Sequence, residues 1–171
     1  MVFGRQNRIR RFGERVGFLG VTVFFLAAAQ AALAQETLAG RVVSVTDGDT
    51  ITVLGSANTQ YTIRLAGIDA PEHNQAFGQR SKQNLSRLVF SQNVTLDCGK
   101  EESYGRLVCK VMVQGRDACL EQVRDGMAWH YKQFQDEQTQ GDRKLYASAE
   151  DAAREARGGG SSGTVVFSRG P

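Results

Sequence analysis

The sequence predicts an α+β domain in which five strands and three helices form a small, partly open barrel. Three observations predict this class: five short segments have strand-like patterns, turn residues separate several of them, and helical spacing of apolar residues recurs in three other segments. Residues 35–171 are enough for one hydrophobic core of ordinary size. The sequence therefore predicts a single globular domain.

The first three predicted strands follow one another with short turns between them. Asp47-Gly48 is the turn between the first two, and residues 55–58 turn the chain into the third. In the third strand Arg64 points away from the core, because its immediate neighbours are apolar and alternate with it. The three strands are predicted at 39–46, 50–54 and 61–65.

Helical spacing and two further apolar runs complete the predicted domain. Helices are expected at 77–90 and at 118–125, with strands at 94–96 and 107–113 between them. A final helix is expected to bury one face, formed by Leu145, Ala149, Ala152 and Ala156. Five strands with three helices inserted and appended are consistent with a five-stranded barrel of the oligonucleotide-binding (OB) type.

Positive charge is concentrated in the first 34 residues, which carry five arginines and one glutamate. Residues 35–171 therefore retain 16 of the 21 basic residues and 17 of the 18 acidic ones, a net charge of −1. That balance excludes a strongly basic protein that coats nucleic acid, although it permits a local basic site.

The N-terminal segment has the order of a secretory signal peptide. Basic residues precede an uncharged apolar run, and Ala32-Leu33-Ala34 offers small residues for cleavage after Ala34. An uncleaved membrane anchor is the alternative, because residues 16–34 are just long enough to span a bilayer if Gln30 is tolerated. The predicted organisation is a signal peptide at 1–34, a domain at 35–157 and a flexible tail at 158–171, in a periplasmic or secreted protein.

Export permits a disulfide, and the chain has three cysteines. Cys98 ends one predicted strand and Cys109 lies in the next, so a bridge across this hairpin is the favoured pairing. The alternative is that all three cysteines, Cys119 included, are unlinked and act as small buried apolar groups.

Carboxylates gather at one end of the predicted sheet. Asp49 precedes the second strand and Asp69 follows the third, and position 49 comes opposite about position 66 in this hairpin. Glu72 lies three residues beyond Asp69, past the stiff turn at Pro71. Three carboxylates without histidine or cysteine suit a hard cation such as Ca²⁺ or Mg²⁺.

Plain turn chemistry would explain each acidic segment taken alone, since Asp, Gly and Pro are common turn residues. Arg64 on the exposed side of the third strand changes that interpretation. An arginine beside a carboxylate-bound cation can hold a phosphate and stabilise the charge of its transition state. Arg106 is a second arginine, at the mouth of the next hairpin, and a solvated strand-end charge is the alternative interpretation for it.

Three ordered motifs resemble the staphylococcal-nuclease-like family. They are Asp47-Gly48-Asp49-Thr50, Arg64-Leu65-Ala66-Gly67-Ile68-Asp69-Ala70-Pro71-Glu72 and Tyr104-Gly105-Arg106. Residues 75–78 and 126–129 also look like family segments, so the resemblance covers about residues 39–157. It implies an OB barrel and Ca²⁺-dependent hydrolysis of DNA and RNA that yields 3′-phosphate ends.

The resemblance also implies roles for individual residues. Asp49 and Asp69 correspond to carboxylate ligands of Ca²⁺, and Ala70 corresponds to a ligand that binds through its backbone carbonyl. Glu72 corresponds to the general base, or to the group that orients the attacking water. Arg64 and Arg106 correspond to the two arginines that clamp the phosphate.

Softer candidates are aromatic and imidazole side chains near these motifs. Tyr104 and Tyr131 offer flat faces for the bases of a single strand, which such barrels hold without reading sequence. His73 and His130 are interpreted as surface imidazoles rather than acid–base catalysts.

The leading hypothesis is an exported, monomeric, calcium-dependent endonuclease that acts on DNA and RNA, preferably single-stranded, with little sequence preference. The alternative is a catalytically inactive OB-fold module of the cell envelope that binds nucleic acid or protein. Such modules usually lack part of the acidic or arginine set, whereas this chain has all of it.

Overall fold

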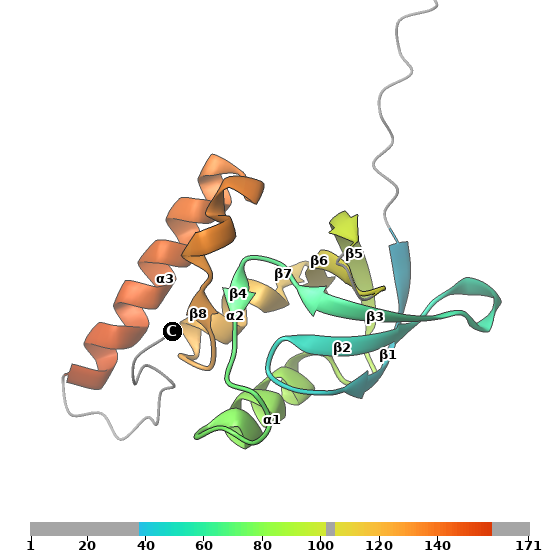
Figure 1. Cartoon of the computed structure of the whole chain (residues 1–171), viewed down its shortest axis with the longest axis horizontal. Coiled ribbons are helices and arrows are strands. Elements are labelled where there is room, and N and C mark those ends of the chain that lie inside the picture. The colour runs from blue at the N-terminus through green and yellow to red at the C-terminus, as the bar shows by residue number, and fades with distance from the viewer. Residues whose placement is uncertain (1–37, 102–104, 159–171) are drawn as a thin grey trace, which may run out of the picture. The chain divides into compact units, whose positions relative to one another are not determined.

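A computed structural model describes residues 38–101 and 105–158 (Figure 1). The predicted signal peptide and nearly all of the predicted tail lie outside the described residues, and so does Tyr104. Within the described residues, no helix combines the length and apolarity that crossing a bilayer requires.

Five strands form the predicted barrel. Their order in the sheet is β3-β2-β1-β5-β6, and β3 also pairs in parallel with β6, which closes the sheet on itself. The strands are β1 (Leu38–Val45), β2 (Thr50–Leu54), β3 (Gln60–Leu65), β5 (Asn93–Glu101) and β6 (Leu107–Val113). The five-stranded OB barrel predicted from the sequence is confirmed.

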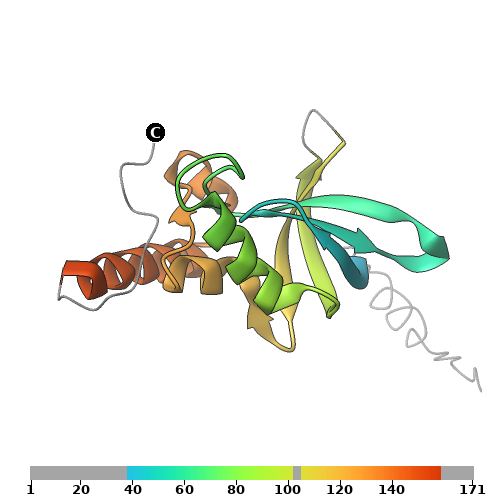
Figure 2. The ribbon, with the colours of Figure 1, turned by 90° about the horizontal axis from the view of Figure 1, so that it is seen from below.

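The three predicted helices are also found within residues 38–101 and 105–158: α1 (Gly78–Val89), α2 (Ala118–Arg124) and α3 (Gln140–Gly158). α2 contacts both α1 and α3, and Figures 1 and 2 show α2 and α3 at one end of the barrel. Short pieces complete the chain: the strands β4 (Ile68–Asp69), β7 (Arg116–Asp117) and β8 (Trp129–His130), with 3₁₀ turns η1 (Ser56–Asn58) and η2 (Lys132–Glu137).

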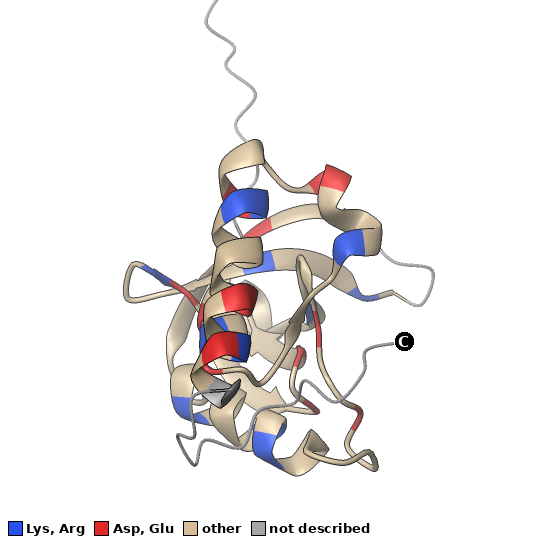
Figure 3. Ribbon diagram, turned by 90° about the vertical axis from the view of Figure 1, so that its left-hand side faces the viewer, with Lys and Arg blue, Asp and Glu red and all other residues tan. Residues whose placement is uncertain are grey.

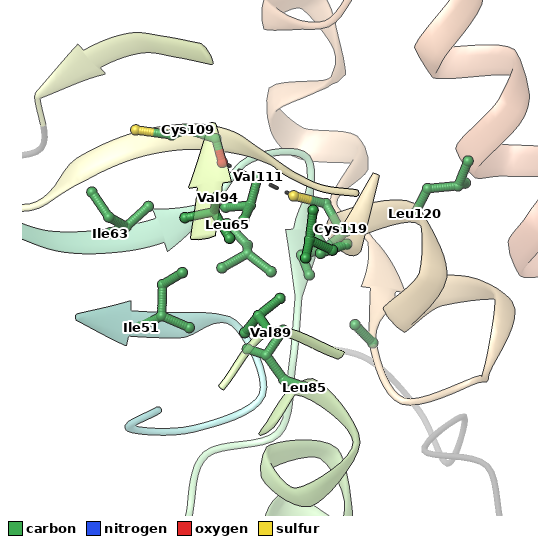
Figure 4. Packing of buried hydrophobic residues seen from close by; sticks show 14 of the residues in the cluster. Ile51, Ile63, Leu65, Leu85, Val89, Val94, Cys109, Val111, Cys119 and Leu120 are labelled. Carbon is green, nitrogen blue, oxygen red and sulfur yellow. Dashed lines mark hydrogen bonds between the residues drawn. The ribbon is translucent and has the colours of Figure 1, made fainter. Parts of the chain in front are cut away.

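The hydrophobic core fills the barrel and continues beneath the helices (Figure 4). Ile51 and Ile63 from neighbouring strands are fully buried, as are Leu85 and Val89 from α1. Each such side chain contributes about 1.5–3 kcal/mol when it leaves water. The core therefore holds α1 against the barrel strands that carry the predicted site.

Cys98 and Cys109 form the predicted disulfide between the paired strands β5 and β6. Cys119 is the free thiol left over, and it is buried with its Sγ 4.0 Å from the carbonyl oxygen of Cys109 (Figure 4). Burial raises the pKa of the Cys119 thiol far above its usual range. Cys119 therefore behaves as a small core residue.

The buried face of α3 was predicted wrongly. Leu145, Ala152 and Ala156 are exposed, and only Ala149 of the predicted face is buried. Tyr146 is buried instead, because its ring lies against His130 and its hydroxyl donates to Asp117 at 2.8 Å. These contacts rotate the buried face by about one residue.

Two other predictions differ in extent. β5 runs from Asn93 to Glu101, well beyond the predicted 94–96, because β1 and β6 pair along it on both sides. Its pairing with β6 shifts register between Cys98 and Lys100. Acidic and basic residues are interspersed over the ribbon rather than gathered in one basic stripe (Figure 3), in agreement with the nearly neutral charge.

Candidate active site

Asp49 lies at the end of the tight turn that joins β1 to β2. The amide of Asp49 donates to Asp47 Oδ1 at 3.1 Å, and the Thr50 hydroxyl donates to Asp49 Oδ1 at 3.0 Å. Only 4% of Asp49 is exposed. The turn thus holds a nearly buried carboxylate at the end of the barrel.

Arg64 bridges the two predicted ligand aspartates. Antiparallel pairing of β2 with β3 puts Thr50 opposite Arg64, so Asp49 lies beside the guanidinium. Its Nη1 donates to Asp49 Oδ2 at 2.6 Å, and its Nη2 donates to Asp69 Oδ1 at 3.0 Å. Because one planar guanidinium reaches both carboxylates, Asp49 and Asp69 converge as the sequence predicted.

Asp69 is the last residue of the short strand β4, which follows β3 and pairs with β8, and Ala70 comes directly after it. The amide of Ala70 donates to Asp49 Oδ2 at 3.0 Å. The amide of Leu65 donates to the Asp49 carbonyl at 2.8 Å, so the hairpin register is one residue from the predicted pairing of 49 with 66. The backbone therefore ties Asp49 to the segment that carries Asp69.

The electrostatics of the bridge are dominated by burial. Burial raises the pKa of the Asp49 carboxyl to about 7, against the opposing effect of the Arg64 cation, and Asp47 raises it further. Burial alone would lower the pKa of Arg64, but Asp49 and Asp69 raise it above its ordinary value. A further cation beside these carboxylates would favour the charged form of Asp49.

Glu72 is exposed and stands apart from the aspartate bridge. Its amide donates to Gln75 Oε1 at 2.9 Å, and its carbonyl accepts from the Gln75 amide at 2.9 Å. A side chain at Gly78 would come within 2.0 Å of the Glu72 carbonyl oxygen, so glycine is required there. Within residues 38–101 and 105–158, no three acidic, histidine or cysteine side chains form a metal-binding group, so the expected three-carboxylate cluster is not found.

Arg106 immediately precedes β6 and is partly buried. Parallel pairing puts Arg64 of β3 opposite Val108, which lies two residues after Arg106. The same pairing puts Ile63 opposite Leu107, so Arg106 comes directly before the seam between β3 and β6 that carries Arg64. The two predicted phosphate-binding arginines thus belong to neighbouring strands of the barrel.

Tyr131 packs over Arg64, with the guanidinium carbon 5.9 Å from the centre of the ring. The amide of Tyr131 donates to the Gly67 carbonyl at 2.9 Å, and Phe134 packs edge-on against its ring at 5.0 Å. Tyr131 therefore borders the bridge, whereas the other predicted aromatic, Tyr104, lies outside the described residues.

Two polar side chains are buried although the sequence analysis did not predict it. His130 is only 4% exposed and its Nε2 lies 2.8 Å from Gln138 Oε1, so it is not a surface imidazole. Gln122 of α2 is fully buried, and its Nε2 donates to the Gly48 carbonyl at 2.7 Å. The available signal was a glutamine between Leu120 and Val123, within the predicted short helix at 118–125.

A cavity of about 400 Å³ lies elsewhere, between the barrel and the start of α3. Val108, Lys110, Asp142 and Tyr146 are among its lining residues, and the two arginines, the two aspartates and Glu72 are not. The predicted chemical groups therefore lie outside this cavity.

The donor set around Arg64 fits a hard divalent cation. Asp49 and Asp69 present carboxylate oxygens close together, and Ala70 adds a backbone carbonyl in the same segment. Cations with few protein ligands complete their coordination with water or substrate oxygens. Such an ion would be held by these three residues, of which both aspartates contact Arg64.

Comparisons with known proteins agree with this arrangement. A family model described as staphylococcal nuclease homologue matches residues 62–159. An uncharacterized endonuclease of Haemophilus influenzae is 47% identical over 103 residues, which are 60% of this chain and 58% of the relative. The micrococcal nuclease of Shigella flexneri is 36% identical over 128 residues, 70% of this chain and 71% of that protein.

Coverage of these relatives is partial, and the chain spans only 58% of the Haemophilus protein's length. The family model nevertheless covers more than half of the sequence, and it includes Arg64, Asp69, Glu72 and Arg106. With the closed five-stranded barrel, this match establishes that the chain belongs to the staphylococcal nuclease family.

Proposed function

We propose that the protein is a calcium-dependent endonuclease that hydrolyses DNA and RNA with little sequence preference and leaves 3′-phosphate ends. One observation carries the proposal: Arg64 is held between Asp49 and Asp69, in the strand that pairs with β6 directly after Arg106. The names of the relatives, an endonuclease and a micrococcal nuclease, support the same reaction class.

A phosphodiester is the substrate that this charge pattern suits. Its phosphate carries a full negative charge that repels an attacking hydroxide, so hydrolysis needs neutralising groups close to the phosphorus. Two guanidinium groups bind phosphate oxygens with directed hydrogen bonds. The near-neutral body of the protein makes this local charge, rather than a broad basic surface, the source of binding.

Each residue then has a defined task. Arg64 and Arg106 bind the non-bridging oxygens and stabilise the charge that grows on them in the transition state. Glu72, exposed at the edge of the site, orients a water and accepts its proton. Asp49, Asp69 and the Ala70 carbonyl would hold a calcium ion, which would further neutralise the charge of the phosphate. The water oxygen bonds to phosphorus as the bond to the 5′-oxygen breaks, and the 5′-oxygen takes up a proton from solvent water, so the phosphate remains on the 3′ side.

Tyr131 gives the site a flat surface beside Arg64 for an unpaired base. A base can stack there only where it is not paired in a duplex, which favours single strands. The same stacking is tolerant of sequence, because every base has a flat face. The proposed enzyme acts as a monomer, with its groups supplied by one barrel.

The protein is proposed to work in the periplasm or outside the cell. The disulfide between Cys98 and Cys109 is typical of an oxidising compartment, and the leader has the order of a secretory signal. An uncleaved leader would instead anchor the domain at the outer face of the membrane.

The decisive experiment incubates the purified full chain with single-stranded DNA and RNA, first with Ca²⁺ and then with a chelator. Wild-type protein should cleave both in Ca²⁺, lose activity with the chelator, and leave ends that a 3′-phosphatase can process. Glu72→Gln should bind Ca²⁺ with unchanged affinity and cleave about 10²–10³ times more slowly. Binding of nucleic acid without any Ca²⁺-dependent cleavage would instead identify an inactive binding module.

A further inference from the structure

We infer that Gln122 is a positioning residue that fixes the turn carrying Asp49, and through it the calcium site. The inference rests on the proposed function, because it gives Gln122 a task in that reaction. Gln122 contacts none of the proposed reacting groups itself. Its side chain acts on the backbone of Gly48, the residue directly before Asp49.

The carboxamide of Gln122 is fully buried and its hydrogen bonds join three elements. Its Nε2 donates to the Gly48 carbonyl at 2.7 Å and lies 3.3 Å from the Ser81 carbonyl of α1. Its Oε1 accepts from Asn84 Nδ2 at 2.7 Å. A buried amide without partners would cost about 1–3 kcal/mol, so these bonds hold the side chain in one orientation.

Two charged side chains that bond to Asn84 fix the orientation of the Asn84 and Gln122 amides. Arg87 can only donate, and its Nη2 donates to Asn84 Oδ1 at 2.6 Å. The Asn84 Nδ2 must then face the acceptors, which are Asp125 Oδ2 at 2.8 Å and Gln122 Oε1. Gln122 therefore has to present its NH₂ group to Gly48, and an amide flip would break several bonds at once.

The turn at Gly48 has no room to move toward α1. A Cβ at Gly48 would lie 1.8 Å from Ser81 Oγ, which donates to the Met127 carbonyl at 2.6 Å. The backbone is thus pressed against α1 while Gln122 holds its carbonyl. Asp49 follows one residue later, so the direction of its carboxylate depends on this clamp.

Groups that hold metal ligands in place commonly contribute 10- to 100-fold to metal affinity. Gln122→Met keeps the length of the side chain but removes its hydrogen bonds. We expect its dissociation constant for Ca²⁺, measured by calorimetry with the metal alone, to rise about tenfold. The Ala70 amide, which donates to Asp49, should also exchange its hydrogen faster than in wild type.

The matched control is Val123→Ala, which creates a cavity at the neighbouring buried position of α2. It should lower the melting temperature while leaving Ca²⁺ affinity within about twofold of wild type. Equal effects of Gln122→Met and Val123→Ala on affinity and on Ala70 exchange would overturn the inference. If Gln122→Met does not fold, Asn84→Ala supplies the test, with an expected threefold loss of Ca²⁺ affinity. Effects of Asn84→Ala equal to those of Val123→Ala would then overturn the inference.

Failure of the two proposals is distinguishable. If wild-type protein binds no Ca²⁺, the proposed function is wrong, and Ala70 exchange alone then decides whether Gln122 fixes the turn. If wild-type protein binds Ca²⁺ and both α2 variants bind it equally well, only the inference about Gln122 is overturned.

Discussion

Two basic residues in this molecule each bridge a pair of aspartates, with different consequences. Arg64 bridges Asp49 and Asp69, and Lys110 bridges Asp142 at 2.8 Å and Asp117 at 3.4 Å. The Lys110 bridge joins β6 to Asp117 of the paired strand β7 and to Asp142 of α3, which lies 32 residues further along the chain. The Arg64 bridge joins segments that strand pairing already holds together.

The acceptors in the second bridge also have structural tasks. Asp117 Oδ1 caps α2 by accepting from the amides of Cys119 and Leu120, and its Oδ2 accepts from the Tyr146 hydroxyl. Asp142 accepts from Thr139 at the start of α3. The Lys110 bridge therefore ties α3 to the barrel, whereas the Arg64 bridge joins segments at one end of a barrel that is already paired. A basic side chain between two carboxylates indicates a functional site when the fold does not need that ion pair to hold its elements together.

Replacing the bridging cations should separate the two roles most strongly. Arg64→Lys keeps the charge but loses the planar group that reaches both carboxylates and phosphate oxygens, so kcat should fall about 10²–10³-fold. Lys110→Arg should leave kcat within a few-fold of wild type. Steady-state cleavage of single-stranded DNA measures both, and similar losses would show that the two bridges do not differ in role.

Calcium should stabilise the protein through one aspartate pair only. At 100 times its dissociation constant, Ca²⁺ should add about 2.7 kcal/mol to the free energy of unfolding of wild type. Asp49→Asn should lose this increment. Asp117→Asn should be less stable than wild type without Ca²⁺ but should gain the same increment when Ca²⁺ is added. Urea unfolding with Ca²⁺ and with chelator measures the increments, and an increment retained by Asp49→Asn would remove Asp49 from the ligand set.

Removing the cation from the second bridge should cost stability rather than activity. Lys110→Met leaves Asp117 and Asp142 facing each other without a shared donor, so the free energy of unfolding should fall by about 1–2 kcal/mol. Cleavage of single-stranded DNA at saturating Ca²⁺ should stay near the wild-type rate. A large loss of kcat without a loss of stability would place Lys110 in the reaction.

The sequence was sufficient to predict that Asp49 and Asp69 converge near Arg64, because local rules determine this arrangement. Strand alternation puts Arg64 on the outer side, and turn residues put Asp49 and Asp69 at one end of the barrel. The closed barrel followed from the same alternation. These features depend on neighbours close in sequence or in a hairpin.

Other features depend on contacts that local patterns do not contain. The buried face of α3 is set by Tyr146 reaching His130 and Asp117, so the spacing of alanines predicted the wrong side. Gln122 is buried because its amide finds partners on α1 and in the turn at Gly48. A single sequence offers no signal for such partners, which lie 38 and 74 residues away.

The smallest expected effect concerns the pH dependence of the second bridge. Although partial burial acts in the opposite direction, the hydrogen bond from Lys110 lowers the pKa of Asp142 below its ordinary 3.8. A carboxyl with a lowered pKa in the folded state contributes stability above 3.8, and this contribution is lost as the pH falls through the folded-state value. Asp142→Asn should therefore reduce the free energy of unfolding by about 0.5–1 kcal/mol at neutral pH. Urea unfolding should show that difference shrinking as the pH falls below 3.8 and through the folded-state pKa of Asp142. A difference that persists in acid would mean that Asp142 acts through its hydrogen bonds with Thr139 rather than through its charge.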